Sequence, residues 1–305
     1  MKKLPYALCA LLLCLVVGCA DDDETPLDSG ISQPGAGEPE ATLGATLTCP
    51  WDQSDPTLHT FIVAGQSGMV AQYGRPGTLP AAYETGIDQL QMWDEGSWKR
   101  LGLGLSNGNG VPRYGPALAF VWTMHAACPD SNIGIIKYAV GGTSIDTWVL
   151  SGENGAELHD RVLAAYEAHP DITFEGFIYK QGAGDMQNRA KAESWGEKYL
   201  SIVDFYRSAA IVPNDLPFIH ATPRVDGFPD DISDIDPDSI PSPAPDRPYA
   251  VHVTLEQWMV QYSRPGIYPT IMRDIPLGDD GTHATPDGIR LEGRNYAETY
   301  ANEAN

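Results

Sequence analysis

The sequence predicts an α/β fold with three layers, in which helices cover both faces of a central parallel sheet. Short apolar segments rich in β-branched residues alternate with longer segments whose apolar residues recur at helical spacing. Glycine clusters end several of the short segments, as expected where a buried strand turns into a loop. The length of 305 residues suits one large domain with an appendage, or two small domains. Alternation of strands and helices favours parallel pairing of the strands.

Four short segments predict strands and four longer segments predict helices. The strands are expected at residues 60–64, 132–140, 174–180 and 217–221, and the helices at 116–127, 158–168, 194–210 and 286–303. Pro286 lies at the first turn of the last helix, where the missing N–H group leaves no hydrogen bond unmade. In open sheets of this type, ligands bind at the carboxyl ends of the strands. The functional residues are therefore expected directly after strands.

The first residues predict a targeting signal. Lys2 and Lys3 precede an apolar run at 4–17, which is shorter than the roughly 20 residues that cross a bilayer. A basic start, a short apolar core and a small-residue exit are typical of a secretory signal peptide. Residues 16–19 (Val-Val-Gly-Cys) resemble the lipobox of bacterial lipoproteins, a family in which the cysteine is lipidated.

By this resemblance, residues 1–18 are the signal peptide and Cys19 is a lipid anchor. The protein would then reside in the bacterial cell envelope, on the outer membrane or the periplasmic face, or be secreted. An ordinary cleaved signal is the alternative. Residues 19–48 are acidic, rich in Gly and Pro and nearly free of aromatics, which predicts a flexible tether before a domain at 49–305.

Composition excludes two classes of protein. Forty-one acidic against 19 basic side chains give a net charge of −22, and no basic stripe appears, which excludes a nucleic-acid binder. A hydrophobic content of 42% excludes a disordered chain. The acidic surface also predicts a preference for neutral over anionic substrates. Membrane contact is expected through the N-terminal lipid only, and no obligatory protein partner is inferred.

The cysteines predict one disulfide. Of the five, Cys9 and Cys14 leave with the signal peptide, and Cys19 is the expected anchor. Cys49 and Cys128 remain as an even pair in an oxidising compartment, which favours a bridge, with two buried free thiols as the alternative.

A proline-rich segment interrupts the strand–helix alternation. Nine prolines fall between Pro213 and Pro248, and residues 226–246 are densely acidic. The segment lacks the glycine and terminal glutamate of an EF-hand loop, so we predict a solvated loop and no metal site. No cofactor is expected either.

Four clusters of small and polar residues carry the chemistry. Residues 65–69 (Gly-Gln-Ser-Gly-Met) follow the first strand and precede an expected helix, which would aim backbone N–H groups at a developing oxyanion beside Ser67. Residues 141–144 (Gly-Gly-Thr-Ser) and 181–185 (Gln-Gly-Ala-Gly-Asp) follow later strands. Residues 280–283 (Asp-Gly-Thr-His) precede the last helix, and an Asp three residues before a His can fix the tautomer of its ring.

Together these clusters resemble the four blocks of the SGNH (GDSL-like) hydrolases, a superfamily with a flavodoxin-like fold. They are most similar to the sialate O-acetylesterase-like branch, carbohydrate esterase family six. The resemblance implies Ser67 as nucleophile, His283 as general base and Asp280 as the partner of His283. It implies an oxyanion hole formed by the backbone N–H groups of Ser67 and Gly142 and by the Gln181 side chain. Candidate substrate contacts beside the blocks are Gln66, Arg113, Thr143 and Trp148.

Two positions depart from the family pattern. Gly68 stands where the family has asparagine after the serine, and Ala183 where it has glutamate. The predicted function is a carbohydrate O-acetylesterase that acts on polysaccharide or sialic acid through a serine acyl-enzyme. The departures leave a non-catalytic surface carbohydrate-binding protein on a degenerate esterase fold as one alternative. A general short-chain or lipid esterase is the other.

Overall fold

The computed structural model describes residues 47–70, 73–105, 111–223, 235–242, 245–272 and 274–303. The chain divides into two units, 1–42 and 43–305, and every described residue belongs to the second. The predicted signal peptide, Cys19 and the tether up to residue 46 lie outside the described residues, as do 224–234 and 243–244 in the proline-rich segment. No helix within the described ranges is both long and apolar enough to cross a membrane.

The described residues form a seven-stranded sheet in the order β3-β2-β4-β1-β5-β6-β7. All neighbouring pairs are parallel except β2 and β3, which are antiparallel. The strands are β1 (Leu58–Gly65), β2 (Leu90–Asp94), β3 (Ser97–Arg100), β4 (Asn132–Ala139), β5 (Thr173–Lys180), β6 (Phe218–Pro223) and β7 (Ile267–Met272). Because β1, β4, β5 and β6 are parallel, their carboxyl ends meet at one edge of the sheet.

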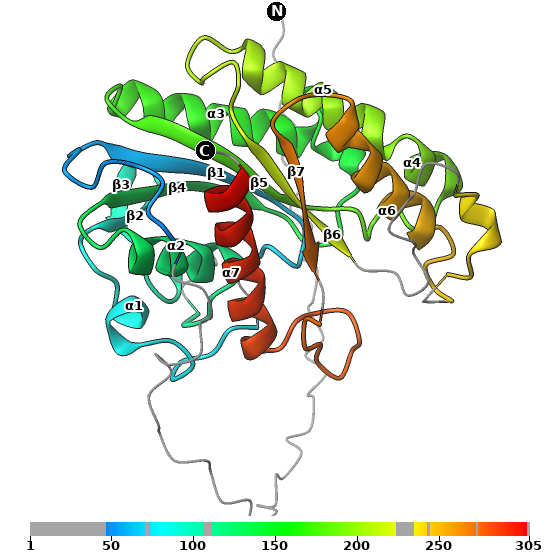
Figure 1. The fold of residues 1–305 in the computed structure, drawn as a ribbon, viewed down its shortest axis with the longest axis horizontal. Coiled ribbons are helices and arrows are strands. Elements are labelled where there is room, and N and C mark those ends of the chain that lie inside the picture. The colour runs from blue at the N-terminus through cyan, green and yellow to red at the C-terminus, as the bar shows by residue number, and fades with distance from the viewer. Residues whose placement is uncertain are drawn as a thin grey trace, which may run out of the picture. The chain divides into compact units, whose positions relative to one another are not determined.

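Helices cover both faces of this sheet, which confirms the predicted three-layer α/β fold (Figure 1). One face carries α2 (Pro116–Ala127) and α7 (Pro286–Glu303), and the short helix α1 (Ala81–Thr85) lies near α2. The other face carries α3 (Glu153–Ala168), α4 (Arg189–Glu193), α5 (Trp195–Ser208) and α6 (Ala250–Met259). Three short 3₁₀ helices are η2 (Ile145–Thr147), η3 (Pro237–Ser239) and η4 (Val260–Tyr262).

Each face of the sheet has its own apolar core. In the central strand β1, Phe61 and Val63 point into the core beneath α2 and α7, whereas Ile62 and Ala64 point into the core beneath α3 and α5. All four side chains are fully buried. A parallel strand covered on both faces requires such a continuous apolar run, and this run is what made β1 recognisable from the sequence.

The sequence-based boundaries agree closely where periodicity is strong. The helices predicted at 116–127 and 286–303 are those observed. Strands β2, β3 and β7 and helices α1, α4 and α6 were not predicted. Pro269 interrupts the strand pattern of β7, and β7 tolerates it as an edge strand. The helix expected after Ser67 was wrong for residues 67–70, which form a turn in which the Met69 N–H donates to Gln66 O at 2.7 Å.

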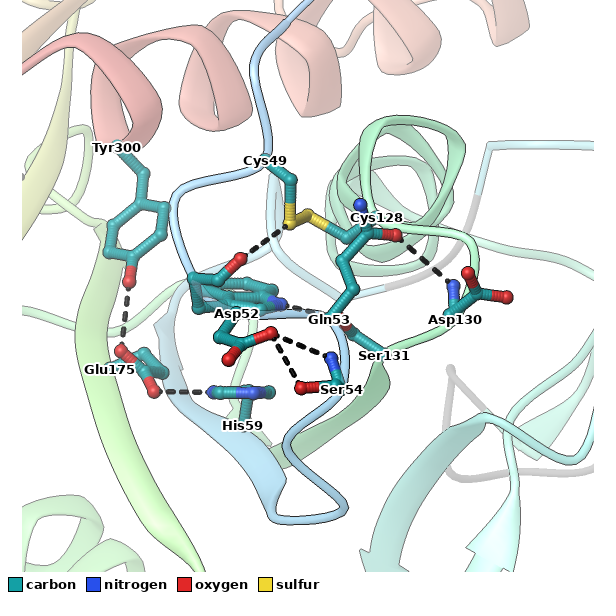
Figure 2. The surroundings of a disulfide bond; sticks show 11 residues. Cys49, Asp52, Gln53, Ser54, His59, Cys128, Asp130, Ser131, Glu175 and Tyr300 are labelled. Atoms are coloured by element: carbon teal, nitrogen blue, oxygen red, sulfur yellow. Dashed lines mark hydrogen bonds and ion pairs between the residues drawn. A yellow bond between two sulfur atoms is a disulfide. The ribbon is translucent and has the colours of Figure 1, made fainter.

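The structure joins Cys49 to Cys128, with a Cα–Cα distance of 5.1 Å (Figure 2). The bridge fixes the segment before β1 to the end of α2, near the amino-terminal ends of β1 and β4. Beside it, the Trp51 ring stacks on His59 at 4.4 Å, and Trp51 Nε1 donates to Ser131 Oγ at 2.7 Å. The segment is therefore held at the edge of the sheet opposite the carboxyl ends of the strands.

Removal of this bridge is expected to destabilise the domain. The bridge closes a loop between residues 79 apart, and such a constraint contributes about 2–4 kcal/mol, chiefly by restricting the unfolded chain. Urea unfolding of the oxidised protein and of the Cys49→Ser/Cys128→Ser variant should show a lower transition midpoint for the variant. Equal midpoints would contradict this role.

Candidate active site

A chain of hydrogen bonds links three side chains at the carboxyl edge of the sheet. Ser67 lies in the turn directly after β1, and His283 lies in the loop before α7. Ser67 Oγ is 3.0 Å from His283 Nε2, and His283 Nδ1 is 2.7 Å from Asp280 Oδ2. Ser67 and His283 are half-buried, whereas the Asp280 carboxylate is about half exposed. The structure thus brings together the three residues of the predicted catalytic set.

The turn around Asp280 fixes the charge of its carboxylate. Asp280 Oδ1 accepts hydrogen bonds from the backbone N–H groups of His283 and Thr282, both at 2.9 Å. The bond from the His283 backbone, followed by those from the His283 ring and the Thr282 backbone, holds the pKa of Asp280 well below its usual range. An ionised Asp280 favours the tautomer in which Nδ1–H donates to it, and His283 Nε2 then accepts from Ser67.

The glycine pair after β4 lies beside Ser67. A Cβ atom at Gly141 would lie 3.6 Å from Ser67 Cβ, and Gly142 has a φ of +74°, which favours glycine. Within the described part of the chain, no acceptor takes the backbone N–H of Ser67 or of Gly142. Both N–H groups are therefore available as hydrogen-bond donors, and their role as an oxyanion hole stays a prediction.

Gln181 is tied into a network instead. Its Nε2 donates to Thr143 O at 3.1 Å and to Asp185 Oδ2 at 2.6 Å, and its Oε1 accepts from Trp195 Nε1 at 2.7 Å. An amide nitrogen carries two hydrogens, and both have acceptors here. The predicted role of Gln181 as an oxyanion donor therefore requires one of these bonds to break.

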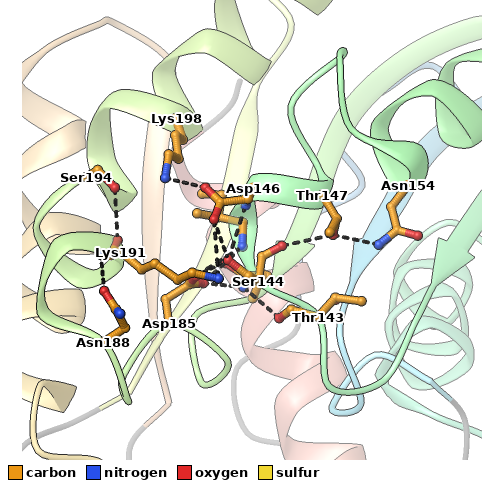
Figure 3. A network of polar contacts seen from close by, with 12 residues as sticks. Thr143, Ser144, Asp146, Thr147, Asn154, Asp185, Asn188, Lys191, Ser194 and Lys198 are labelled. Atoms are coloured by element: carbon orange, nitrogen blue, oxygen red, sulfur yellow. Dashed lines mark hydrogen bonds and ion pairs between the residues drawn. The ribbon is translucent and has the colours of Figure 1, made fainter.

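The centre of this network is Asp185, which the sequence analysis did not single out (Figure 3). Its carboxylate is fully buried and accepts hydrogen bonds from the Ser144 hydroxyl and from the Ile145 N–H at 3.0 Å. The same carboxylate holds Gln181. Asp185 thus binds the loop after β4 to the loop after β5, which fixes the position of the glycine pair next to Ser67.

The candidate substrate contacts divide into two groups. Gln66 lines the pocket beside Ser67. In the amide orientation that satisfies both ends, its Nε2 donates to Thr143 O at 3.3 Å and its Oε1 accepts from the Ala183 N–H at 3.1 Å. Arg113 is exposed and does not line this pocket. The Thr143 hydroxyl donates to Val140 O at 2.9 Å and accepts from Trp148 Nε1 at 3.0 Å, so both of its hydrogen-bonding roles are occupied within the protein.

The prediction that Trp148 contacts substrate was wrong. Its side chain is 2% exposed and packs against Tyr138 and Tyr179 in the core beneath α3 and α5. The ring N–H donates its hydrogen bond to the Thr143 hydroxyl. Trp148 therefore supports the loop after β4 from below and offers no surface to a sugar ring.

Ser67 and His283 open onto a pocket of about 370 Å³. One wall is apolar and comes from the loop after β1, the end of β7 and the loop before α7, with Val70, Met272, Ile275 and Leu277. Lys180, Arg247 and Glu292 also line it. A second histidine on a nearby strand, His220 of β6, does not line the pocket. Burial lowers its pKa to about 4, and its Nε2 lies 2.7 Å from Gln257 O. No cluster of metal-ligating side chains occurs in the described ranges.

Tyr73 is a site residue that sequence reasoning missed. Its ring stacks on the His283 imidazole, with centroids 4.5 Å apart and an interplanar angle of 20°. Burial, followed by the charge of Asp280, raises the pKa of the Tyr73 phenol, so the ring is neutral at pH 7. No pattern in the sequence pairs Tyr73 with a residue so distant along the chain.

The profile of the family described as "carbohydrate esterase, sialic acid-specific acetylesterase" matches residues 57–302. The chain belongs to this family. The match runs from β1 to the last turn of α7, and it includes all four sequence blocks. No protein among the curated sequences matches the chain significantly.

Solved structures share the fold of this esterase at low sequence identity. A protein from Arabidopsis thaliana has 18% identity and a TM-score of 0.64 over 82% of this chain and 100% of its own. NanS has 13% identity and a TM-score of 0.59 over 80% of this chain and 96% of its own. XAC1771, described as a novel carbohydrate acetylesterase from Xanthomonas citri, has 18% identity and a TM-score of 0.55 over 81% of this chain but only 56% of its own.

Loss of the Tyr73 ring should slow ester hydrolysis. A stacked pair of this kind contributes about 0.5–1.5 kcal/mol, so Tyr73→Ala should lower kcat/KM by roughly 2- to 12-fold because His283 loses one of its supports. Tyr73→Phe keeps the ring and should retain the wild-type rate. Equal losses in both variants would instead implicate the phenol hydroxyl.

Proposed function

We propose that the protein hydrolyses O-acetyl esters of carbohydrates through an acetyl-enzyme formed on Ser67. The observation that carries this proposal is the unbroken chain of hydrogen bonds from Asp280 through His283 to Ser67, which ends at an open pocket. Membership of the carbohydrate esterase family supports an ester of a carbohydrate as the substrate. The departures at Gly68 and Ala183 leave this chain intact.

The reaction takes place in two steps. Ser67 Oγ attacks the acetyl carbonyl carbon while His283 Nε2 takes the hydroxyl proton, and the bond between carbonyl carbon and sugar oxygen then breaks as His283 returns the proton to the sugar. Water next attacks the acetyl-serine, His283 takes one proton from that water, and this proton passes to Ser67 as acetic acid leaves and ionises in solution. Asp280 stabilises the imidazolium in both steps.

The negative charge that develops on the carbonyl oxygen needs donors that are already in place. The N–H groups of Ser67 and Gly142 supply them, and Asp185 holds the loop that presents Gly142. A single preorganised donor of this kind contributes about 10²–10³ in rate.

Ser67→Ala tests the proposed nucleophile. It should reduce the release of 4-nitrophenol from 4-nitrophenyl acetate by at least about 10³-fold, because no other group can form the acyl-enzyme. Ser201→Ala, an exposed serine on α5 outside the pocket, is the matched control and should keep the wild-type rate. Equal rates for Ser67→Ala and the wild type would reject Ser67 as the nucleophile.

A lipid or general esterase is the second candidate function. The observation that favours it is the apolar wall formed by Val70, Met272, Ile275 and Leu277, which could also accept a longer acyl chain. In the same assay, faster turnover of 4-nitrophenyl octanoate than of the acetate would select this function over acetyl ester hydrolysis.

The charge of the pocket bears on which sugar is bound. Arg247 lines the pocket, and its Nη2 donates to the uncharged Thr282 Oγ1 at 2.7 Å. Among the described residues, its carboxylate contact runs from Nε to Asp246 and is 3.8 Å long. Lys180 is neutralised by Glu292. Arg247 therefore offers a local positive charge on a protein whose overall charge is −22. This charge supports binding of a sugar that carries a carboxylate, in contrast to the preference for neutral substrates that the overall charge predicts.

Arg247→Gln should discriminate between anionic and neutral substrates. A charge-assisted hydrogen bond contributes about 1.5–3 kcal/mol, so kcat/KM for O-acetylated sialic acid should fall by roughly 10- to 150-fold, with little change for acetylated xylooligosaccharide. Arg264→Gln, an exposed arginine that does not line the pocket and pairs with Asp204, is the control. The same loss on both sugars would show that Arg247 does not recognise a carboxylate.

Anchoring in the cell envelope through a lipid on Cys19 stays a proposal that rests on the sequence. Its support is the lipobox-like segment at 16–19 and the acidic tether that follows.

A further inference from the structure

We propose that Lys180 is a positioning residue that holds Ser67 and His283 in place. Its side chain occupies the space that Gly68 leaves open. The proposal rests on the proposed function, because it takes Ser67 as the nucleophile. Lys180 ends β5 and lines the same pocket as Ser67 and His283. It has no role in the reaction steps described above, and it contacts the elements on both sides of the reacting pair.

The backbone of Lys180 supports the turn that carries Ser67. Lys180 pairs with Gly65 in the parallel register of β1 and β5, and Lys180 O accepts a hydrogen bond from the Gln66 N–H at 2.9 Å. Gly65 has a φ of +146°, and a Cβ atom there would lie 2.2 Å from Lys180 O. Residue 65 must therefore be a glycine, because any side chain there would collide with the Lys180 carbonyl where the chain turns towards Ser67.

The side chain of Lys180 occupies the place of the missing side chain at residue 68. A Cβ atom at Gly68 would lie 2.6 Å from Lys180 Cε, 2.9 Å from Nζ and 3.0 Å from Cδ. The φ of Gly68 is outside the left-handed region, so the backbone does not require a glycine here; a side chain at residue 68 would instead have to displace the end of the Lys180 side chain. Gly68 and Lys180 are thus a matched pair: the lysine provides the packing against the serine turn that the family pattern assigns to an asparagine.

The ammonium group of Lys180 connects this turn to the element that follows His283. Lys180 Nζ donates to Glu292 Oε1 at 2.5 Å, and the Glu292 side chain is only 4% exposed. Glu292 Oε2 has no hydrogen-bond partner within the described ranges, so Lys180 is the described partner of this carboxylate. Because a buried carboxylate requires a partner, the pair holds α7 against β5, and α7 begins three residues after His283.

Lys180 thereby constrains both atoms of the Ser67–His283 hydrogen bond. Its backbone and carbon chain contact the turn that carries Ser67, and its ammonium group pairs with the helix that follows His283. A misplacement of reacting groups by about 1 Å can cost 10²-fold in rate. Loss of Lys180 should consequently lower kcat and leave KM nearly unchanged, since it disturbs the reacting geometry and not the binding of the sugar.

The first test removes the ion pair without leaving a buried charge. In Lys180→Met/Glu292→Gln, methionine keeps the chain over Gly68 and glutamine keeps the shape of the acid. We expect kcat for 4-nitrophenyl acetate to fall by at least about tenfold, with KM changed by less than about threefold. Lys99→Met, a half-buried lysine on β3 that does not line the pocket, is the control and should match the wild type. A kcat for the double variant within about twofold of the wild type would overturn the proposal.

The second test uses the match between Gly68 and Lys180 and remains decisive if the first variant does not fold. Gly68→Asn alone should lower kcat, because the new side chain displaces Lys180. Combined with Lys180→Ala, the same asparagine fills the vacated space, so the double variant should have a higher kcat than Lys180→Ala alone. A lower or equal kcat for the double variant would contradict the exchange of one side chain for the other.

These outcomes separate the positioning role from the proposed function. If the wild type hydrolyses no acetyl ester, or is indifferent to Ser67→Ala, the proposed function fails. If activity depends on Ser67 but both sets of Lys180 variants behave as the wild type, only the positioning role fails.

Discussion

The hydrogen bond between Ser67 and His283 joins residues 216 positions apart, and most of the architecture around the pocket can be understood as holding that one contact. Parallel pairing brings the ends of β1, β4 and β5 to one edge, which sets the serine turn beside the loops at 141–144 and 181–185. Helix α7 packs on the same face as α2 and brings the Asp280–His283 loop to that edge. Two buried carboxylates then hold these elements in position. Asp185 links the loops at 141–144 and 181–185, and Glu292 links α7 to β5 through Lys180.

The two departures from the family pattern have different structural consequences. At residue 68 the absent side chain is replaced by the carbon chain and ammonium of Lys180, so the serine turn remains packed. At residue 183 no other described side chain takes the place of the absent carboxylate. Ala183 lines the pocket together with Met186, Ala250, Thr254 and Gln257. The pocket therefore extends towards α6 at the position where the family has a charged side chain. The first departure is compatible with the proposed reacting geometry, whereas the second places an alanine on the wall of the pocket.

Much of this arrangement could be predicted from the sequence, for identifiable reasons. Continuous apolar runs and helical periodicity located β1, β4, α2 and α7, and the spacing between Asp280 and His283 indicated their contact. Strands such as β7, with Pro269 inside it, do not carry the pattern of a strand. Contacts such as Tyr73 on His283, or Lys180 over Gly68, depend on tertiary packing between distant segments, and Trp148 was misassigned because burial is not visible in a single residue type.

The proposed reaction requires that Ser67 becomes acetylated during turnover, and rapid-quench mass spectrometry measures this directly. The enzyme would be mixed with 4-nitrophenyl acetate, quenched in acid within the first turnovers, digested and mapped by peptide. The account predicts an acetyl group on the hydroxyl of Ser67, formed at a rate at least equal to kcat and absent from Ser67→Ala. Turnover with no acetylated Ser67, or with the acetyl group on another residue at a competent rate, would contradict it.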